Sequence, residues 1–402
     1  MANNLVTREE LEVFTERVNE SCPILEDARN LNKTIKGKKG GKIAVSIPDP
    51  GTTVVTRGRI PIIGAPGSGA DITNTDINEF EKEFQVCVAS NACTIDAMEE
   101  VTGIDSFEQE IVSPRCASVG AGVQADIVGS SFPVADSAYV AALGSSFDGF
   151  GLLSDMAGDL DDSQIQGELV GYMSGTIKAK IAKSGAEKFN AEGIVGELYR
   201  QAKIGEYANV MWKKAAMPIV ETSAASAPSA ITGIAGDRGE ITVTVASGAK
   251  YPIGYAFKIT GIMKKDVLGG DTAMEKVFIL KEAVTASGTS AVFKVEPFSA
   301  TGAHANVSRM PTTSDKPTAL LEASKSYAVV WAFMKGNLAF NAVKLPSSGL
   351  DEVSAASGNG KVIMSAIVDG DKNHEGTYRF DAAYIGGAVD SRRAVVGYIK
   401  LA

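Results

Sequence analysis

Apolar residues at intervals of four predict that the chain is organised around one long helix. Ser106 and Gln109 fit a capping box at its start. A stripe then follows at spacings of four or multiples of four: Phe107, Ile111, Val119, Val123 and Ile127. The helix, about 106–130, would have about 25 residues and span ~37 Å at ~1.5 Å per residue. Pro114 is expected to kink it or remove a hydrogen bond, and Gly120 and Gly122 weaken it, so tertiary packing must hold it. Two short helices broken at Pro114 are the alternative.

The N-terminal region predicts a helical arm followed by a basic run. Thr7 and Glu10 fit a capping box at the start of residues 6–29, and Pro23 limits the helix. The basic run that follows is broken by glycines and contains Lys33, Lys36, Lys38, Lys39 and Lys42. It is either a solvated linker or an arm that meets an acidic neighbour or nucleic acid.

Residues 42–90 predict a long two-stranded excursion. Lys42–Pro48 alternates apolar and polar residues, and the Asp49-Pro50-Gly51 turn follows it. Gly64–Gly69 is a flexible tip, and the chain returns through alternating Phe84, Val86 and Val88. Isolated two-stranded ribbons are only marginally stable in water. We therefore expect this ribbon to lie on something else, such as a neighbouring subunit.

The middle of the chain predicts mixed elements. Helices are expected at Thr94–Thr102, Val134–Leu143 and Thr176–Phe189, with an apolar segment at Leu169–Met173. Leu198–Thr222 is expected to start as helix or turn and to end as a strand near Pro218.

After the small-residue linker Ser223–Pro228, the pattern changes to short alternating strands with glycine-rich turns. These strands are expected at Gly239–Ala246, Tyr255–Gly261, Glu275–Ala283 and Ala291–Glu296. Their regular spacing predicts a small barrel or sandwich inserted at about 223–326. Further strands are expected at Tyr327–Phe333, Leu338–Lys344, Val362–Val368, Tyr378–Ile385 and Val395–Lys400.

Length, charge and cysteine content limit the classes of protein to which the chain could belong. The 402 residues, 45% hydrophobic and 22% charged, are enough for a large core in two or three domains. The net charge of −9 argues against bulk attraction to nucleic acid. Four cysteines without a CxxC pair predict reduced thiols. No signal peptide and no apolar run of ~20 residues is recognised, so no membrane partner is expected.

Sequence motifs that are typical of catalytic and ligand-binding sites are mostly missing. Gly64–Asp71 resembles a phosphate-binding loop, but Ala70 and Asp71 stand where that motif requires Lys and Ser or Thr. An acidic cluster at Asp155, Asp159, Asp161 and Asp162 does not match the EF-hand spacing, so a solvated helix end is expected. Only His304 and His374 are available as a triad base, and neither has a nucleophile-elbow pattern. We expect no enzyme activity, no cofactor and no metal. Trp212 and Trp331 are expected in the core.

Several segments together resemble the coat proteins of short-tailed double-stranded DNA phages. One is Leu198–Thr222, with a Tyr-Arg pair, a glycine and then Pro-Ile-Val-Glu-Thr. The Pro114 helix is similar to that family's spine helix, and Tyr378–Gly387 with Gly397–Ile399 is similar to its last two strands. The insertion after Thr222 falls where coat proteins of the Salmonella-phage type carry an extra β-barrel. The collinear order is the specific part of the resemblance.

The resemblance implies an α+β fold, the Johnson capsid fold shared by tailed phages and herpesviruses. Its parts would be a 1–40 N-terminal arm, a 41–92 E-loop, a 93–145 peripheral domain with the spine helix, a 146–222 axial domain, a 223–326 inserted β-barrel and a 327–402 return to the core. Gly120 and Gly122 depart from a usual spine helix.

The resemblance also implies candidate contacts between subunits. They are Lys36, Lys38 and Lys39 in the basic run, Arg57 and Arg59 on the E-loop, Lys264, Lys265, Asp266 and Asp271 on a loop of the insertion, and Arg392 and Arg393 in a turn between the last strands. The two arginines either make ion pairs between subunits near a capsomer axis or occupy an exposed turn. The charged residues of the insertion loop are expected to be exposed, and an exposed pair contributes only ~0–1 kcal/mol.

The leading hypothesis is therefore a major capsid protein of a podovirus that self-assembles as pentamers and hexamers into an icosahedral shell. Its partners would be further copies, a scaffolding protein, a portal protein at one vertex and non-specifically held double-stranded DNA. It would be made in the bacterial cytoplasm and located in the virion. The alternatives are a β-rich surface or adhesion protein that binds through 223–326, and an enzyme of unknown type.

Overall fold

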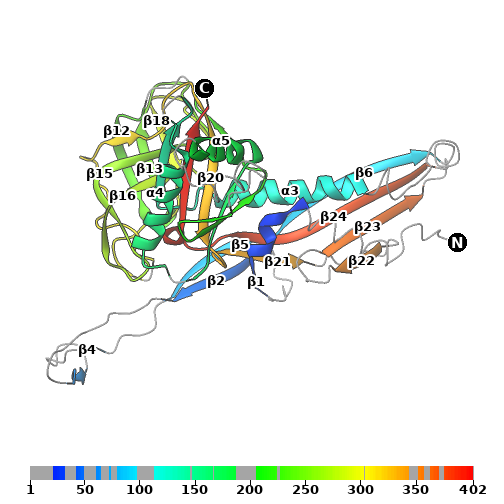
Figure 1. The fold of residues 1–402 in the computed structure, drawn as a ribbon, viewed down its shortest axis with the longest axis horizontal. Helices are drawn as coiled ribbons and strands as arrows, with labels where there is room; N and C mark the ends of the chain where they lie inside the picture. The colour runs from blue at the N-terminus through cyan, green and yellow to red at the C-terminus, as the bar shows by residue number, and fades with distance from the viewer. Residues whose placement is uncertain are drawn as a thin grey trace.

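Two large β-sheets with their helices, a unit of smaller sheets and a projecting hairpin make up the fold (Figure 1). The computed structural model describes residues 21–31, 42–48, 60–64, 72–73, 79–96, 113–144, 147–165, 167–186, 205–223, 227–302, 304–343, 352–356, 363–370 and 375–401. The predicted basic run other than Lys42, the glycine-rich tip beyond Gly64 and the first 20 residues lie outside them.

The first large sheet has the strand order β7-β25-β20-β8-β10-β9, with β11 also pairing with β20. Its strands are β7 (Ser137–Ala142), β8 (Leu169–Met173), β9 (Glu206–Tyr207), β10 (Val210–Lys214), β11 (Ile219–Glu221), β20 (Ser326–Met334) and β25 (Ala394–Lys400). Successive side chains of a strand point to opposite faces, so the central strand β20 supplies two cores. Val329 and Trp331 face one core, and Val330 and Ala332 face the other.

Helices α4 (Gly149–Asp162) and α5 (Gly175–Ala186) cover one face of this sheet. The Asp148 side chain caps α4 by accepting a 2.9 Å hydrogen bond from the backbone N–H of Gly151. Apolar residues of α4 such as Leu153 and Met156 pack there with Trp212. Trp212 and Trp331 are both buried, which confirms the expectation for them.

The second large sheet has the order β1-β21-β24-β23-β22. Strand β24 is long enough to pair with β21 along one half and with β23 along the other, and β6 also pairs with it. Its strands are β1 (Arg29–Asn30), after the short helix η1 (Pro23–Asp27), then β6 (Cys87–Asp96), β21 (Leu338–Val343), β22 (Glu352–Ala356), β23 (Ile363–Gly370) and β24 (Glu375–Ala388). The 19-residue helix α3 (Ser113–Ser131) runs along β6 and β24 (Figure 1).

Helix α3 confirms part of the predicted long helix. Val119, Val123 and Ile127 are buried as the stripe requires. The expected start at Ser106 lies outside the described residues. Pro114 lies in the first turn of α3, where backbone N–H groups have no partner within the helix, so it removes no hydrogen bond from α3. The alternative of two short helices broken at Pro114 involves residues 106–112, which lie outside the described residues.

Strands β12 to β19 form a unit with a core of its own. They are β12 (Ala230–Ala235), β13 (Glu240–Thr244), β14 (Lys250–Tyr251), β15 (Ala256–Lys265), β16 (Asp271–Ile279), β17 (Val284–Thr285), β18 (Ser290–Lys294) and β19 (Pro317–Ala319), with the 3-10 turn η3 (Gly236–Arg238). They pair as β12-β13-β18, β14-β17 and β16-β15-β19 around Ile241, Phe257 and Phe293. The four strands predicted here are confirmed, with shifted ends.

The hairpin consists of β2 (Lys42–Pro48) and β5 (Glu79–Gln85), which pair antiparallel over seven residues. Beyond it lie the short parallel strands β3 (Ile63–Gly64) and β4 (Ile72–Thr73). Figure 1 shows β2 leaving the body and β4 far from it. The predicted two-stranded excursion is confirmed, although the return strand is interrupted at Val86.

Two predicted helices are wrong where the structure describes them. Val134–Leu143 contains strand β7, whose pairing with β25 outweighs local helix propensity. Thr94–Asp96 belongs to β6, which pairs with β24, and the rest of that prediction lies outside the described residues. The strand expected to end near Pro218 ends at Lys214, and β11 starts after Pro218.

Candidate functional site: a buried charge seam and a projecting hairpin

Buried ion pairs connect the β12–β19 unit to the rest of the molecule. We call the pairs Asp136–Lys276, Asp159–Lys264 and Lys82–Glu296 the charge seam. In each pair one partner comes from the β12–β19 unit and the other from outside it. Charged side chains are almost never fully buried unless they are paired. The seam is therefore a specific feature of how this unit sits on the large sheets.

Lys276 of β16 pairs with Asp136, which precedes β7. The backbone carbonyl of Asp136 also accepts a 2.9 Å hydrogen bond from the N–H of Val277, so the two segments are held at both backbone and side chain. Burial lowers the pKa of Lys276, against the opposite effect of Asp136. The Lys276 ammonium lies 5.7 Å from the centre of the Phe278 ring.

Lys264 of β15 reaches α4, where it pairs with Asp159 and donates to the Ser163 hydroxyl over 2.8 Å. Both charged side chains are buried. This overturns two expectations: Lys264 is not on an exposed loop, and Asp159 does not belong to a solvated helix end. Asp159 faces the sheet side of α4 because it follows Leu152 and Met156 by seven and three residues, the spacing of one helix face.

Glu296 links three segments. It accepts from Lys82 of the hairpin at 2.5 Å and from Lys281 at 3.0 Å, and its own side chain is buried. Burial alone would raise the pKa of Glu296, but Lys82, Lys281 and His304 together lower it to about 2. Glu296 is thus an anion at neutral pH in spite of its burial.

The turn between β24 and β25 is buried as well. Arg392 forms two hydrogen bonds to the Asp390 carboxylate, at 2.9 and 3.0 Å, and both side chains are 2% exposed. Arg393 is half-buried and lies 3.5 Å from the same carboxylate. An exposed turn, one of the two alternatives, is therefore wrong for Arg392, which Asp390 binds within the chain, whereas Arg393 is only half-buried and makes a longer contact with the same carboxylate.

Hydrogen bonds from Thr222 to Glu322 and Lys325 join the two chain segments that flank the β12–β19 unit, and we call them the Thr222 clasp. The Thr222 hydroxyl donates to the Glu322 carbonyl at 2.6 Å and accepts from the Lys325 N–H at 2.9 Å. The Thr222 N–H donates to the Lys325 carbonyl at 2.8 Å. A cavity of about 330 Å³ lies beside the clasp, lined in part by Lys250 and Tyr255.

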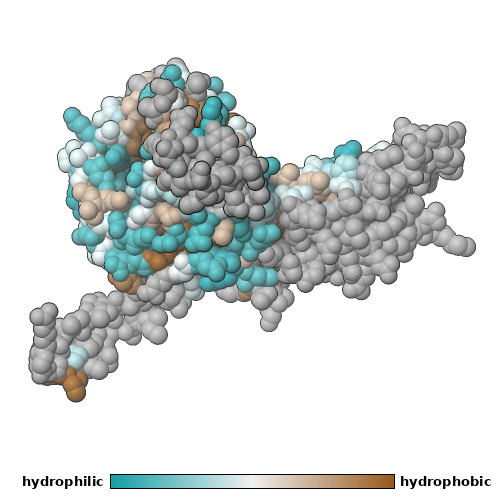
Figure 2. All heavy atoms as spheres, in the orientation of Figure 1, coloured by the Kyte–Doolittle hydropathy of each residue, from teal (hydrophilic) through white to brown (hydrophobic). Residues whose placement is uncertain are grey.

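The segment beyond the hairpin, which includes β3 and β4, presents apolar surface. Ile60 is 87% exposed and Ile62 is 60% exposed. Figure 2 shows apolar surface at this far end, whereas polar residues cover much of the visible body. At the root, Val45 of β2 packs with Ala339 and Val389. The pair Lys42–Glu83 on the hairpin is exposed.

The remaining predicted contact residues divide into two groups. Lys265, Asp266 and Asp271 lie around the predicted loop, where Lys265 pairs with Asp271 at 3.7 Å and Asp266 accepts a 2.6 Å hydrogen bond from the Gly270 N–H. The others lie outside the described residues: Lys36, Lys38, Lys39, Arg57 and Arg59.

The sequence did not identify Lys82, Asp136, Lys276 or Glu296 as special. Each lies in or beside a strand, where a charged residue in a sequence looks like an outward-facing one, and Lys82 and Lys276 even have charged neighbours in Glu81, Glu83 and Glu275. One signal was available for Lys276, which directly precedes Val277–Leu280, a continuous apolar run of the type typical of a strand buried on both faces.

The described residues contain no group of three or more His, Cys, Asp or Glu side chains that could hold a metal ion. No helix in the described part of the chain combines the length and hydrophobicity that crossing a bilayer requires. All four cysteines are described and none forms a disulfide.

Several phage capsids are among the solved structures similar to this chain. The capsid structure of the cyanophage P-SCSP1u has 10% identity and a TM-score of 0.48, covering 93% of this chain and 86% of that one. The mature capsid of bacteriophage PhiM1 has 10% identity and a TM-score of 0.40, covering 93% and 85%. The acidic stable capsid of the Helicobacter pylori bacteriophage KHP30 has 8% identity and a TM-score of 0.44, covering 93% and 87%.

These TM-scores are below 0.5 and the identities are 8–10%, so the likeness does not assign the chain to a family. No protein-family model matches the chain, and no curated protein matches it.

Proposed function

We propose that this chain is the major capsid protein of a short-tailed phage and assembles as pentamers and hexamers into an icosahedral head around double-stranded DNA. The observation that carries the proposal is the hairpin, which projects from the body and exposes Ile60 and Ile62 beyond it. Burying apolar surface contributes roughly 25 cal/mol per Å². Contact with another copy would bury these side chains, which the described part of the subunit leaves in water.

In this proposal the hairpin belongs to an E-loop at 41–92, and α3 is the spine helix of a peripheral domain at 93–145. Residues 146–222 and 327–402 form the axial and returning parts, 1–40 an N-terminal arm and 223–326 an inserted barrel. The unit's own core and the Thr222 clasp support the last assignment. The role is structural rather than enzymatic, with scaffolding and portal proteins as partners and the virion as the location.

Of the predicted contact residues, Lys265, Asp266, Asp271 and Arg393 are the described candidates for contacts between copies. Lys36, Lys38, Lys39, Arg57 and Arg59 remain proposed contacts on the arm and the loop. Lys264 and Arg392 are no longer proposed, because both are buried in pairs within the chain.

Electron microscopy of the purified protein, alone and with a scaffolding protein, tests the proposal. Shells or capsomer rings are the expected result. Replacing Ile60 and Ile62 together by Asp is expected to abolish them and leave a folded subunit. Val292→Asp is the matched control, since Val292 is 45% exposed on β18 and away from the hairpin. Monomers under all conditions would contradict the proposal and favour a surface or adhesion protein.

A further inference from the structure

Strands β2 and β5 pair only with each other among the described strands, and Val86 alone separates β5 from β6 of the second large sheet. No ladder of hydrogen bonds between described strands joins the hairpin to that sheet, so side-chain contacts at the root must fix its direction beyond this one-residue connection. Two such contacts are present, and they involve different parts of the molecule.

The first contact is apolar and faces the second large sheet. Val45 packs with Ala339 and Val389. The Phe84 ring lies over Gly387, where an added Cβ would stand 2.6 Å from the ring. Non-directional contacts of this kind hold the root in place but leave its rotation weakly determined.

The second contact faces the β12–β19 unit and is directional. Lys82 of β5 donates to Glu296 at 2.5 Å, with 11% and 4% of the two side chains exposed. Lys281 pairs with the other carboxylate oxygen of Glu296 at 3.0 Å, so this carboxylate also has a partner within the β12–β19 unit, and Lys82 is its partner on the hairpin. Charge-assisted hydrogen bonds constrain geometry more strongly than apolar contacts do.

We propose that Glu296 is a positioning residue that sets the direction of the hairpin through Lys82, so that the β12–β19 unit controls where the hairpin points. The apolar contact holds the root and the ion pair fixes its rotation. This role goes beyond the proposed assembly function and can be tested in the isolated subunit. It requires that loss of the pair change the hairpin's direction while the fold is retained.

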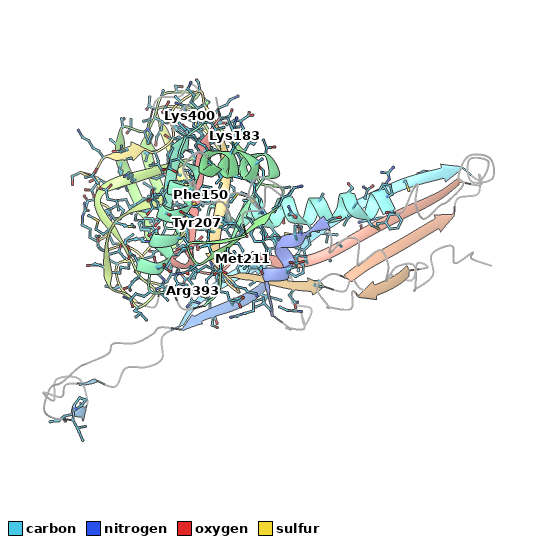
Figure 3. All side chains as sticks on the ribbon, viewed as in Figure 1. Phe150, Lys183, Tyr207, Met211, Arg393 and Lys400 are labelled. Carbon is cyan, nitrogen blue, oxygen red and sulfur yellow. The ribbon has the colours of Figure 1, made fainter. Side chains whose placement is uncertain are left out.

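The experiment measures a distance between two nitroxide labels in the full-length chain by pulsed electron resonance. One label is at Ser46→Cys on β2, and the other is at Lys183→Cys on α5, which Figure 3 shows on the body. Both native side chains are exposed. Cys87 and Cys93 are replaced by Ser. Cys22 and Cys116 are buried, and burial raises the pKa of Cys22 to about 12, so neither is expected to take the label.

The parent protein is expected to give one narrow distance distribution. Lys82→Met and Glu296→Gln are expected to shift it or to broaden it at least twofold. Lys42→Met is the control on the same hairpin, because its pair with Glu83 is exposed, and it should leave the distribution unchanged.

Lys281→Met separates positioning from general destabilisation. It removes the other partner of Glu296 without touching the hairpin, so it should lower the unfolding midpoint yet keep the distribution narrow. The proposal is overturned if Lys82→Met leaves the distribution as it is in the parent. It is also overturned if Lys281→Met broadens the distribution as much as Lys82→Met does. Failure of shell assembly would not affect either result.

Discussion

Lys276 and Asp136 form an ion pair in which each side chain is only 2% exposed. Removing two charges from water costs several kcal/mol per ion, and their attraction offsets this only when the geometry and further hydrogen bonds are good. One oxygen of Asp136, Oδ2, has no hydrogen-bond partner among the described residues. The pair therefore specifies how the β12–β19 unit sits more than it stabilises the fold.

We expect Lys276→Met to lower the free energy of unfolding by about 3–5 kcal/mol, because it leaves the Asp136 carboxylate buried without its cation. The double variant Lys276→Met/Asp136→Leu should recover most of that loss. Urea unfolding checks both. Lys294→Met is the control, since its pair with Glu282 is exposed, and its unfolding midpoint should stay near that of the parent. If the single and double variants lose the same free energy of unfolding, the buried Asp136 charge is not the cause of the loss.

The pKa of Glu296 predicts acid sensitivity. Its pKa falls from 4.5 to about 2 on folding, so ionised Glu296 stabilises the folded state above about pH 4.5. That stability is lost as the pH falls toward about 2. At about 1.4 kcal/mol per pKa unit, the loss amounts to about 3 kcal/mol. Urea unfolding at several pH values in this window should show it, and Glu296→Gln should have a flatter pH dependence. The same slope in Glu296→Gln would assign the effect to other carboxylates.

Local patterns were enough to predict much of the architecture. The buried face of α3 was predicted correctly from Val119, Val123 and Ile127, because residues at helical spacing lie on the same face of a helix. The alternating pattern of Lys42–Pro48 likewise gave β2. β7 was missed because its strand state depends on β25, more than 250 residues later in the chain.

The charge seam could not be predicted for a related reason. Lys82 and Glu296 are 214 residues apart, and nothing near either residue indicates that the other will cover it. Asp159 was taken for a solvated residue because three other aspartates lie nearby in the sequence. Its spacing from Leu152 and Met156 places it on the buried face of α4, where Lys264 of β15 pairs with it. Asp155 and Asp162 remain exposed.

Two glycine positions give opposite predictions for substitution by Ala. A Cβ at Gly171 in β8 would lie 2.3 Å from the Trp212 ring, so Gly171→Ala should cost about 1–3 kcal/mol by overpacking. A Cβ at the exposed Gly158 in α4 would meet nothing within 4 Å, so Gly158→Ala should gain about 0.5–1 kcal/mol. Thermal unfolding followed by the fluorescence of the two buried tryptophans, Trp212 and Trp331, measures both changes. If Gly158→Ala loses more stability than Gly171→Ala, packing around Trp212 does not determine the cost of these substitutions.

The Thr222 clasp predicts a loss that depends on its hydroxyl group. Thr222→Val keeps the size of the side chain but removes the acceptor for the Lys325 N–H and the donor to the Glu322 carbonyl. A hydrogen-bonding group left without a partner costs about 1–3 kcal/mol, so the free energy of unfolding should fall by that amount.

Thr222→Ser keeps the hydroxyl and removes only a methyl group, so it is the matched control and should stay closer to the parent. Hydrogen exchange adds a local measurement, because the Lys325 amide donates to the Thr222 hydroxyl. Its exchange should accelerate in Thr222→Val and remain slow in Thr222→Ser. If both variants lose the same stability and exchange alike, the methyl group rather than the hydroxyl holds the base of the β12–β19 unit together.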